Sequence, residues 1–169
     1  FIITTVFLLN LNSEEGNLTK LNGIDIWWNS HGDKSNPTTL LIMGLTSNSK
    51  VWSDRYINSL VSNDLHVIVF DNRDIGKSTW MTDQPGLITF IKFLPKFLIE
   101  YFVDFIFGFL FDEEGKFNME NPAPAEYDLS DMSMDGIALL DHLGIPEAHL
   151  IGASMGGMIA QVMALEHPD

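Results

Sequence analysis

The sequence contains no cysteine, which removes disulfide bonds, thiolate nucleophiles and cysteine-ligated zinc sites from consideration. It is also poor in basic residues, with 9 Lys and Arg against 23 Asp and Glu and a formal net charge of −14. Because contacts to phosphates require a basic surface, this balance argues against nucleic-acid binding. Charged residues make up 19% of the chain and hydrophobic residues 46%, which is typical of a globular domain.

Long hydrophobic runs are missing as well. The N-terminal run Phe1–Leu9 is apolar but too short to span a bilayer. It is compatible with the remnant of a signal peptide, with a leading strand or with the remnant of an upstream segment, although no basic region or small-residue cleavage site accompanies it. Residues 1–17 are therefore an N-terminal segment of unassigned role, and they predict no cellular compartment.

The most informative segment present is Gly152-Ala153-Ser154-Met155-Gly156, which lies between a short apolar stretch and apolar residues at helical spacing. This context predicts a nucleophile elbow, the strand-to-helix turn that exposes a serine hydroxyl at the top of a parallel sheet. Small neighbours are needed there because strand and helix approach closely and the serine takes a strained conformation. A chance match in a glycine-rich turn is the alternative; the context favours Ser154 as a nucleophile.

A serine hydroxyl is a weak nucleophile until a histidine accepts its proton and an acid orients that histidine. After Ser154 the chain offers only Glu166, His167 and Asp169, at the far end of the predicted helix. At about 1.5 Å rise per residue, His167 would lie on the order of 20 Å from Ser154, so it cannot be the base. The histidines that precede Ser154 are expected to be surface or strand-end residues: His31, His66, His142 and His149.

The ends of the sequence also bear on whether the catalytic residues are all present. The chain begins at Phe1 without an initiator methionine, and no base or acid follows Ser154 at a suitable distance. We therefore expect a fragment cut at both ends. The 169-residue chain by itself is expected to be inactive.

Strand and helix patterns alternate along the rest of the chain. The patterns predict, in chain order, a hairpin over residues 18–31 that turns at Asn22-Gly23, a strand at Thr39–Met43, a helix at Trp52–Val61, a strand at Leu65–Phe70 and a helix at Tyr127–Leu143. Buried strands that alternate with helices predict an α/β fold with a parallel, doubly wound sheet.

These motifs, in this order, resemble the N-terminal half of an α/β-hydrolase, particularly the esterase-like branch that includes aclacinomycin methylesterases. The motifs are Met43-Gly44-Leu45, Asp71–Ser78, Tyr127–Met132, Leu139–Ile145 and Gly152–Gly157. The resemblance covers about residues 20–80 and 124–169. It implies a mostly parallel sheet with flanking helices and an N-terminal hairpin, forming a partial domain over residues 18–169 that is incomplete at its C-terminus.

The resemblance also implies roles for individual residues. Ser154 would be the nucleophile, and the backbone N–H groups of Leu45 and Met155 would form the oxyanion hole. Such main-chain donors are fixed before the reaction and point to where negative charge develops. The family commonly has His-Gly where this chain has Met43-Gly44, which is compatible with the esterase-like branch because the backbone donates.

The loop from Asp71 to Ser78 is similar to the family's D-x-R-x-x-G-x-S segment, and its expected role is structural. Asp71 and Arg73 would hydrogen-bond the loop, and Gly76 would allow a turn with positive φ. A metal site formed by Asp71 and Asp74 is a weak alternative, because no second cluster of ligands accompanies them. Neither a metal nor a cofactor is therefore expected.

Residues 80–121 form an aromatic-rich insertion that these motifs do not explain, and it holds most of the 12 phenylalanines. Charged side chains at every fourth position from Lys92 to Asp104 predict a helix over residues 87–111 that is apolar around most of its girth. The charges argue against a membrane span. Three roles stay open: a helix packed between the sheet and a missing C-terminal cap, a lid or acyl-binding wall, and a helix in peripheral contact with a membrane surface.

Together these observations predict a serine hydrolase that acts on a small-molecule, lipophilic carboxylic ester through an acyl-enzyme. Perhydrolase, amidase and lactonase activities would be compatible with the same residues. The branches with an aspartyl nucleophile are disfavoured, because the nucleophile position is Ser154. The alternative from another class is a non-catalytic, truncated hydrolase domain that serves as a binding module.

Overall fold

The computed structural model describes residues 16–81 and 126–168. All described helices and strands belong to one compact unit, which residues 16–81 and 127–168 form. The helix predicted over residues 87–111, with its three alternative roles, lies outside the described residues. Within the described ranges, no helix is long and apolar enough to cross a membrane.

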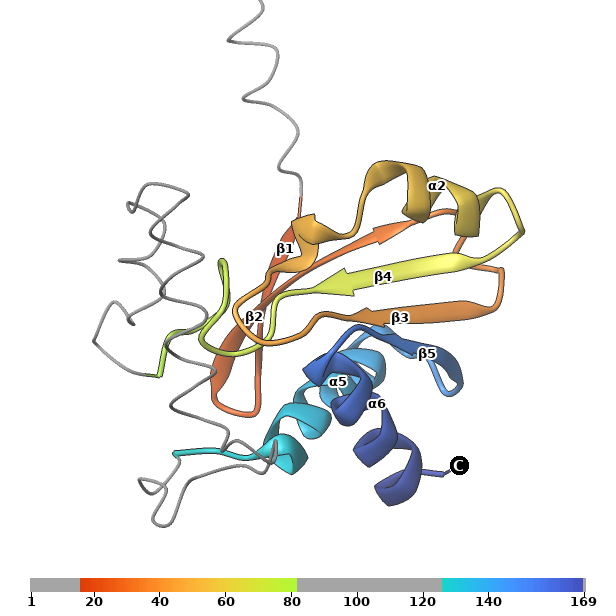
Figure 1. The fold of residues 1–169 in the computed structure, drawn as a ribbon. Helices are drawn as coiled ribbons and strands as arrows, with labels where there is room; N and C mark the ends of the chain where they lie inside the picture. The colour runs from red at the N-terminus through yellow and green to blue at the C-terminus, as the bar shows by residue number, and fades with distance from the viewer. Residues whose placement is uncertain (1–15, 82–125, 169) are drawn as a thin grey trace, which may run out of the picture. The chain divides into compact units, whose positions relative to one another are not determined.

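Five strands form one mixed sheet in the order β1-β2-β4-β3-β5 (Figure 1). The strands are β1 Asn17–Leu21, β2 Ile24–His31, β3 Thr38–Ile42, β4 His66–Phe70 and β5 Ala148–Gly152. The first two pairings across the sheet are antiparallel, whereas β3 pairs in parallel with both β4 and β5. The N-terminal hairpin turns at Asn22 and Gly23, whose φ angles of 50° and 86° are those of a type I′ turn.

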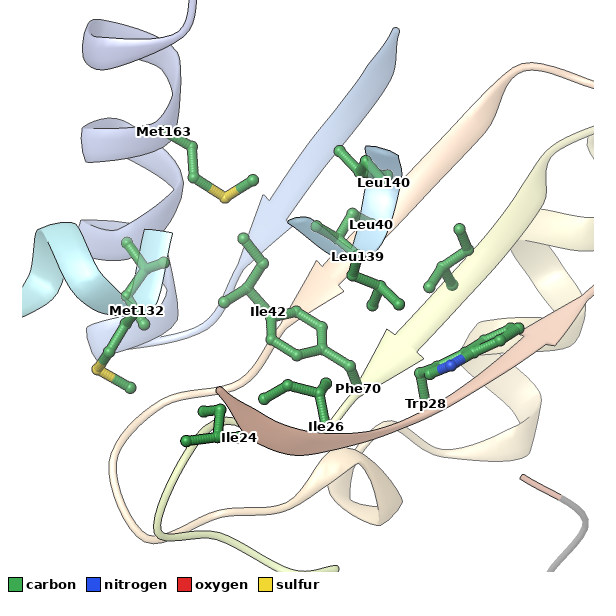
Figure 2. Close-up of a cluster of buried hydrophobic side chains, with 12 residues drawn as sticks. Ile24, Ile26, Trp28, Leu40, Ile42, Phe70, Met132, Leu139, Leu140 and Met163 are labelled. Carbon is green, nitrogen blue, oxygen red and sulfur yellow. The ribbon is translucent and has the colours of Figure 1, made fainter. Parts of the chain in front are cut away.

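The helices cover both faces of this sheet, as the continuous apolar strands predict. Helix α2 (Asp54–Val61) packs on one face, and α5 (Leu129–Leu143) and α6 (Met155–Glu166) lie on the other (Figure 1). Alternate residues of β3 accordingly point into different clusters. Leu40 and Ile42 join the cluster under α5 and α6 (Figure 2), and Leu41 joins the cluster under α2.

The helix boundaries follow from local capping. Trp52–Val61 was expected to be one helix, but a 3₁₀ helix, η1 (Ser49–Val51), ends before Ser53 caps α2 through Tyr56 N–H. Helix α5 begins at Leu129 rather than at Tyr127, because Asp128 and Asp131 form a capping box that places Asp128 outside the helix. Gly144 ends α5 in the left-handed region with a φ of 68°.

The sheet topology brings two loops together. Chain order passes from β3 to β4 on one side, whereas β5 returns on the other side of β3, which makes the carboxyl end of β3 a topological switch point. Ile42, the last residue of β3, is in register with Gly152, the last residue of β5. The loop after β3 and the turn after β5 therefore begin side by side.

Candidate active site

Ser154 lies in the turn between β5 and α6. Its φ of 54° and ψ of −125° lie outside the regions that L-residues favour, and its side chain is exposed. Ser154 occupies the N-cap position of α6, where a serine commonly accepts a hydrogen bond from the helix, yet it forms no capping hydrogen bond. The hydroxyl is thus presented at the positive end of the helix dipole without being used for capping.

Glycines allow this turn to be so tight. A Cβ on Gly152 would overlap the main chain of Gly156, and a Cβ on Gly156 would overlap the carbonyl of Ile42. The turn itself is closed by main-chain hydrogen bonds from Gly156 N–H to Ala153 O and from Gly157 N–H to Ser154 O, both of 2.9 Å. A larger residue at Gly152 or Gly156 would therefore separate α6 from the sheet and move Ser154.

The loop after β3 runs against this turn. A Cβ on Gly44 would lie 2.8 Å from Ala153 O, 2.9 Å from Ser154 Cβ and 3.2 Å from Met155 N. Leu45 follows directly, with its side chain 65% exposed. Among the described residues, the N–H groups of Leu45 and Met155 have no hydrogen-bond acceptor. Gly44, which directly precedes Leu45, therefore lies against the turn that carries Ser154 and Met155.

The loop after β4 contacts the segment that follows β3 through the side chain of Asp71. The buried Asp71 carboxylate accepts hydrogen bonds from Ser49 N–H (2.8 Å), Ser49 Oγ (2.7 Å) and Lys77 N–H (3.0 Å). Gly76 has a φ of 58°, and a Cβ there would overlap the Asp71 carboxylate. The Asp71 oxygens are thus occupied by N–H and O–H donors of the protein.

The Asp74 carboxylate has a hydrogen-bond partner of its own. One of its carboxylate oxygens accepts a hydrogen bond of 2.6 Å from Met81 N–H. The described ranges hold no group of three or more histidine, cysteine, aspartate or glutamate residues placed to bind a metal ion.

Arg73 differs from its expected role. Its guanidinium forms a bidentate ion pair with Asp135 of α5 rather than a hydrogen bond within its own loop, with Nε–Oδ2 and Nη2–Oδ1 distances of 2.7 and 2.8 Å. The Tyr127 ring lies 5.0 Å below the guanidinium. The hydrogen bonds that Arg73 donates to the Asp135 carboxylate raise the pKa of Arg73, whereas burial opposes this effect. The expectation was wrong because the partner lies 62 residues away in sequence and no local pattern marks it.

Asn72 is a further residue that sequence reasoning missed. Its side-chain Nδ2 donates a hydrogen bond of 2.8 Å to the carbonyl of Met43, and the residue is only 2% exposed. Asn72 stands in the sequence between two residues with obvious roles, and an asparagine after a strand is common in loops. No signal in the sequence distinguishes it from an ordinary turn residue.

The structure brings no histidine to Ser154 within the described residues. His66 begins β4, His149 lies near the start of β5, and His31 pairs with Val67, so these three lie toward the amino ends of the parallel strands. Ser154 lies beyond the carboxyl end of β5. His142 lies in the last turn of α5, and His167 caps the far end of α6.

Comparison with known proteins agrees with this architecture. A model of the alpha/beta hydrolase fold matches residues 37–169. Rhodomycin D methylesterase from Streptomyces peucetius is 25% identical over 146 residues, which cover 86% of this chain and 36% of that enzyme. 3-Oxoadipate enol-lactonase 2 from Acinetobacter baylyi is 39% identical over 71 residues, 42% of this chain and 26% of that enzyme. The chain therefore spans well under half of the length of each of these relatives.

Solved structures give the same fold. The crystal structure of epoxide hydrolase A from Mycobacterium thermoresistibile matches 92% of this chain and 36% of its own, with a TM-score of 0.62 and 21% identity. At this level of identity the likeness shows the fold alone.

Proposed function

Since the chain belongs to the α/β-hydrolase family, we propose that it carries the nucleophile and the oxyanion hole of a serine hydrolase that cleaves carboxylic esters. The observation that supports this proposal is the position of Ser154. It is exposed, strained and free of any capping hydrogen bond, and Gly44, which precedes the uncommitted N–H of Leu45, lies against its turn. A serine at the elbow favours acyl transfer over the chemistry of an aspartyl nucleophile.

In the proposed first step, Ser154 Oγ attacks the carbonyl carbon of the ester and loses its proton to a general base. The carbonyl electron pair moves onto oxygen, and the N–H groups of Leu45 and Met155 stabilise the resulting oxyanion. Collapse of this intermediate breaks the ester C–O bond, and the base gives the proton that came from Ser154 to the leaving alkoxide. A single donor of this kind contributes roughly 10²–10³-fold to kcat in serine hydrolases.

In the second step, water attacks the acyl-enzyme with help from the same base. The carboxylic acid is released, and Ser154 regains its proton. Because the described histidines lie far from Ser154, we propose that the base and its orienting acid are supplied by residues that follow Asp169. The 169-residue chain alone is then expected to show no turnover by this route.

The proposed substrate is a small-molecule, lipophilic ester. Rhodomycin D methylesterase and 3-oxoadipate enol-lactonase, which resemble this chain, are named for an ester and for an enol-lactone. The phenylalanine-rich segment 80–121 favours an apolar acyl group, and peripheral membrane contact through residues 87–111 is part of the same proposal.

The test uses the longest open reading frame that contains this chain, expressed and purified as one protein. We expect hydrolysis of p-nitrophenyl butyrate and covalent labelling of Ser154 by a fluorophosphonate. Ser154→Ala is expected to abolish both, whereas Ser59→Ala, an exposed serine on α2, leaves both unchanged. Full activity of Ser154→Ala would overturn the proposal. If the wild type shows no turnover and no labelling, the result would favour the non-catalytic binding module instead.

A further inference from the structure

The loop that carries the Leu45 N–H is held at both ends by consecutive residues. This oxyanion loop, residues Gly44–Asn48, lies between β3 and η1. Directly after the loop, the Asp71 carboxylate accepts hydrogen bonds from both the N–H and the hydroxyl of Ser49. Directly before the loop, Asn72 Nδ2 donates a hydrogen bond of 2.8 Å to Met43 O. The loop after β4 thus clamps the oxyanion loop through two buried side chains.

The clamped loop has a conformation that needs support. Thr46 has a φ of 65°, a left-handed value that is a genuine outlier for a β-branched residue. Within the described ranges, the main-chain hydrogen bond that closes the turn around it is long, at 3.4 Å from Ser47 N–H to Gly44 O. Residues held in this way cost on the order of 1–3 kcal/mol and persist only where the surroundings over-determine them. The contacts made by Asp71 and Asn72 are surroundings of this kind.

Of the two polar atoms of the Asn72 side chain, one has a hydrogen-bond partner in the described residues and the other has none. Its Nδ2 binds Met43 O, but its buried Oδ1 has no hydrogen-bond partner in the described part of the chain. A buried acceptor without a partner is costly, so an asparagine serves packing poorly at this position. The retained contact holds the Met43 carbonyl, which precedes Gly44 and Leu45 directly along the chain.

We propose that Asn72 is a positioning residue that aims the Leu45 N–H at the oxyanion through its hydrogen bond to Met43 O. This inference rests on the proposed function, because it assigns Asn72 a role in the same oxyanion hole. Fixing the Met43 carbonyl orients the peptide plane between Met43 and Gly44. The next N–H, that of Leu45, is thereby held beside Ser154 against the strain at Thr46.

The molecule provides a matched control at the other end of the same two strands. Thr38 Oγ1 and His66 Nδ1, both buried, lie 3.1 Å apart and join the amino end of β3 to that of β4. Thr38→Val therefore removes one buried side-chain contact between these strands, as Asn72→Ala does, but at the end remote from Ser154. A merely structural role for Asn72 predicts the same kinetics for both variants.

The experiment measures kcat and KM for p-nitrophenyl butyrate in the full open reading frame. We expect Asn72→Ala to lower kcat about 10-fold, a part of the roughly 10²–10³-fold carried by one donor, with KM changed less than twofold. Asn72→Leu, which keeps the branched side-chain shape but loses the donor, should show the same split if Asn72→Ala folds poorly. Thr38→Val should keep kcat within twofold of the wild type.

The outcomes separate this inference from the proposed function. If Ser154→Ala abolishes activity but the kcat values of both Asn72 variants match that of Thr38→Val, only the positioning role is overturned. A higher KM with unchanged kcat would overturn it too, since an oxyanion contact acts in the transition state. If Ser154→Ala stays active or the wild type is inactive, the proposed function and this inference both fail.

Discussion

The two ends of β3 make similar contacts with β4 but differ in backbone strain. At the amino end, Thr38 meets His66, and the non-glycine residue with positive φ in the preceding turn is Asp64, a type that tolerates this conformation. At the carboxyl end, Asn72 holds Met43, and the non-glycine residues with positive φ are Thr46, Asp74 and Ser154. The left-handed β-branched Thr46 and the strained Ser154 lie at the carboxyl end, together with the uncommitted N–H groups of Leu45 and Met155, and this is the end that we propose to be catalytic.

The largest expected effect on stability concerns the ion pair between Arg73, in the loop after β4, and Asp135 of α5. Asp135→Asn leaves the buried Arg73 guanidinium without its counter-charge, and breaking such a pair costs about 3–5 kcal/mol of the free energy of unfolding. Urea denaturation measures this loss. Asp141→Asn, an exposed aspartate on the same helix, is the control and should change stability by less than about 0.5 kcal/mol. Equal effects of the two variants would contradict the anchoring role.

The next effect separates two neighbouring glycines of the elbow. Gly156→Ala forces a methyl group into the carbonyl of Ile42 and should cost about 1–3 kcal/mol, with loss of esterase activity because Ser154 moves. Gly157→Ala places its Cβ 3.5 Å from Gly152 O, an ordinary contact, and should keep stability and activity. Thermal denaturation and ester hydrolysis of both variants provide the comparison. A tolerated Gly156→Ala would show that the turn is less tight than described.

A smaller effect tests whether the strain at Thr46 serves function. Thr46→Gly relieves a left-handed β-branched residue but adds chain entropy to the unfolded state, so stability should change by less than about 1 kcal/mol. We expect kcat to fall several-fold all the same, because a glycine holds the oxyanion loop less firmly. The free energy of unfolding and kcat are measured on the same preparation. Unchanged kcat would mean that the strain has no catalytic role.

The smallest effect lies at the amino end and depends on pH. Burial lowers the pKa of His66 below 6.5, Lys34 and His31 lower it further, and Asp33 opposes them. The unfolded chain therefore binds the proton more readily than the folded protein does. The stability from the neutral, buried ring is fully present above pH 6.5 and is lost as the pH falls through the lowered folded pKa. Denaturation midpoints at pH 7.5 and pH 5 measure the loss.

His66→Gln sharpens this test, since it removes the titrating ring from the buried site. We expect its stability to vary less between the two pH values than that of the wild type. His142→Gln, at an exposed position in the last turn of α5, should keep the wild-type dependence. A wild-type pH profile in His66→Gln would assign the effect to another group, such as His31, whose pKa burial also lowers.

Local sequence signals predicted most of the architecture. Asn22-Gly23 specified the hairpin, the apolar run Thr39–Met43 specified a doubly covered strand, and Gly144 specified the end of α5. Each of these features depends on residues within a few positions of one another. The boundary errors at Trp52 and Tyr127 were also local, because helical periodicity does not reveal which residue caps the helix.

The sequence by itself determined the family resemblance, the strand-to-helix turn at Ser154 and the small residues that allow it, because steric limits on φ and ψ act locally. Only the tertiary structure decided that Arg73 binds Asp135, that Asn72 binds Met43 and that Gly44 lies against the elbow. These contacts join segments that are distant along the chain. Their geometry arises from the parallel pairing of β3 with β4 and β5, which no single segment encodes.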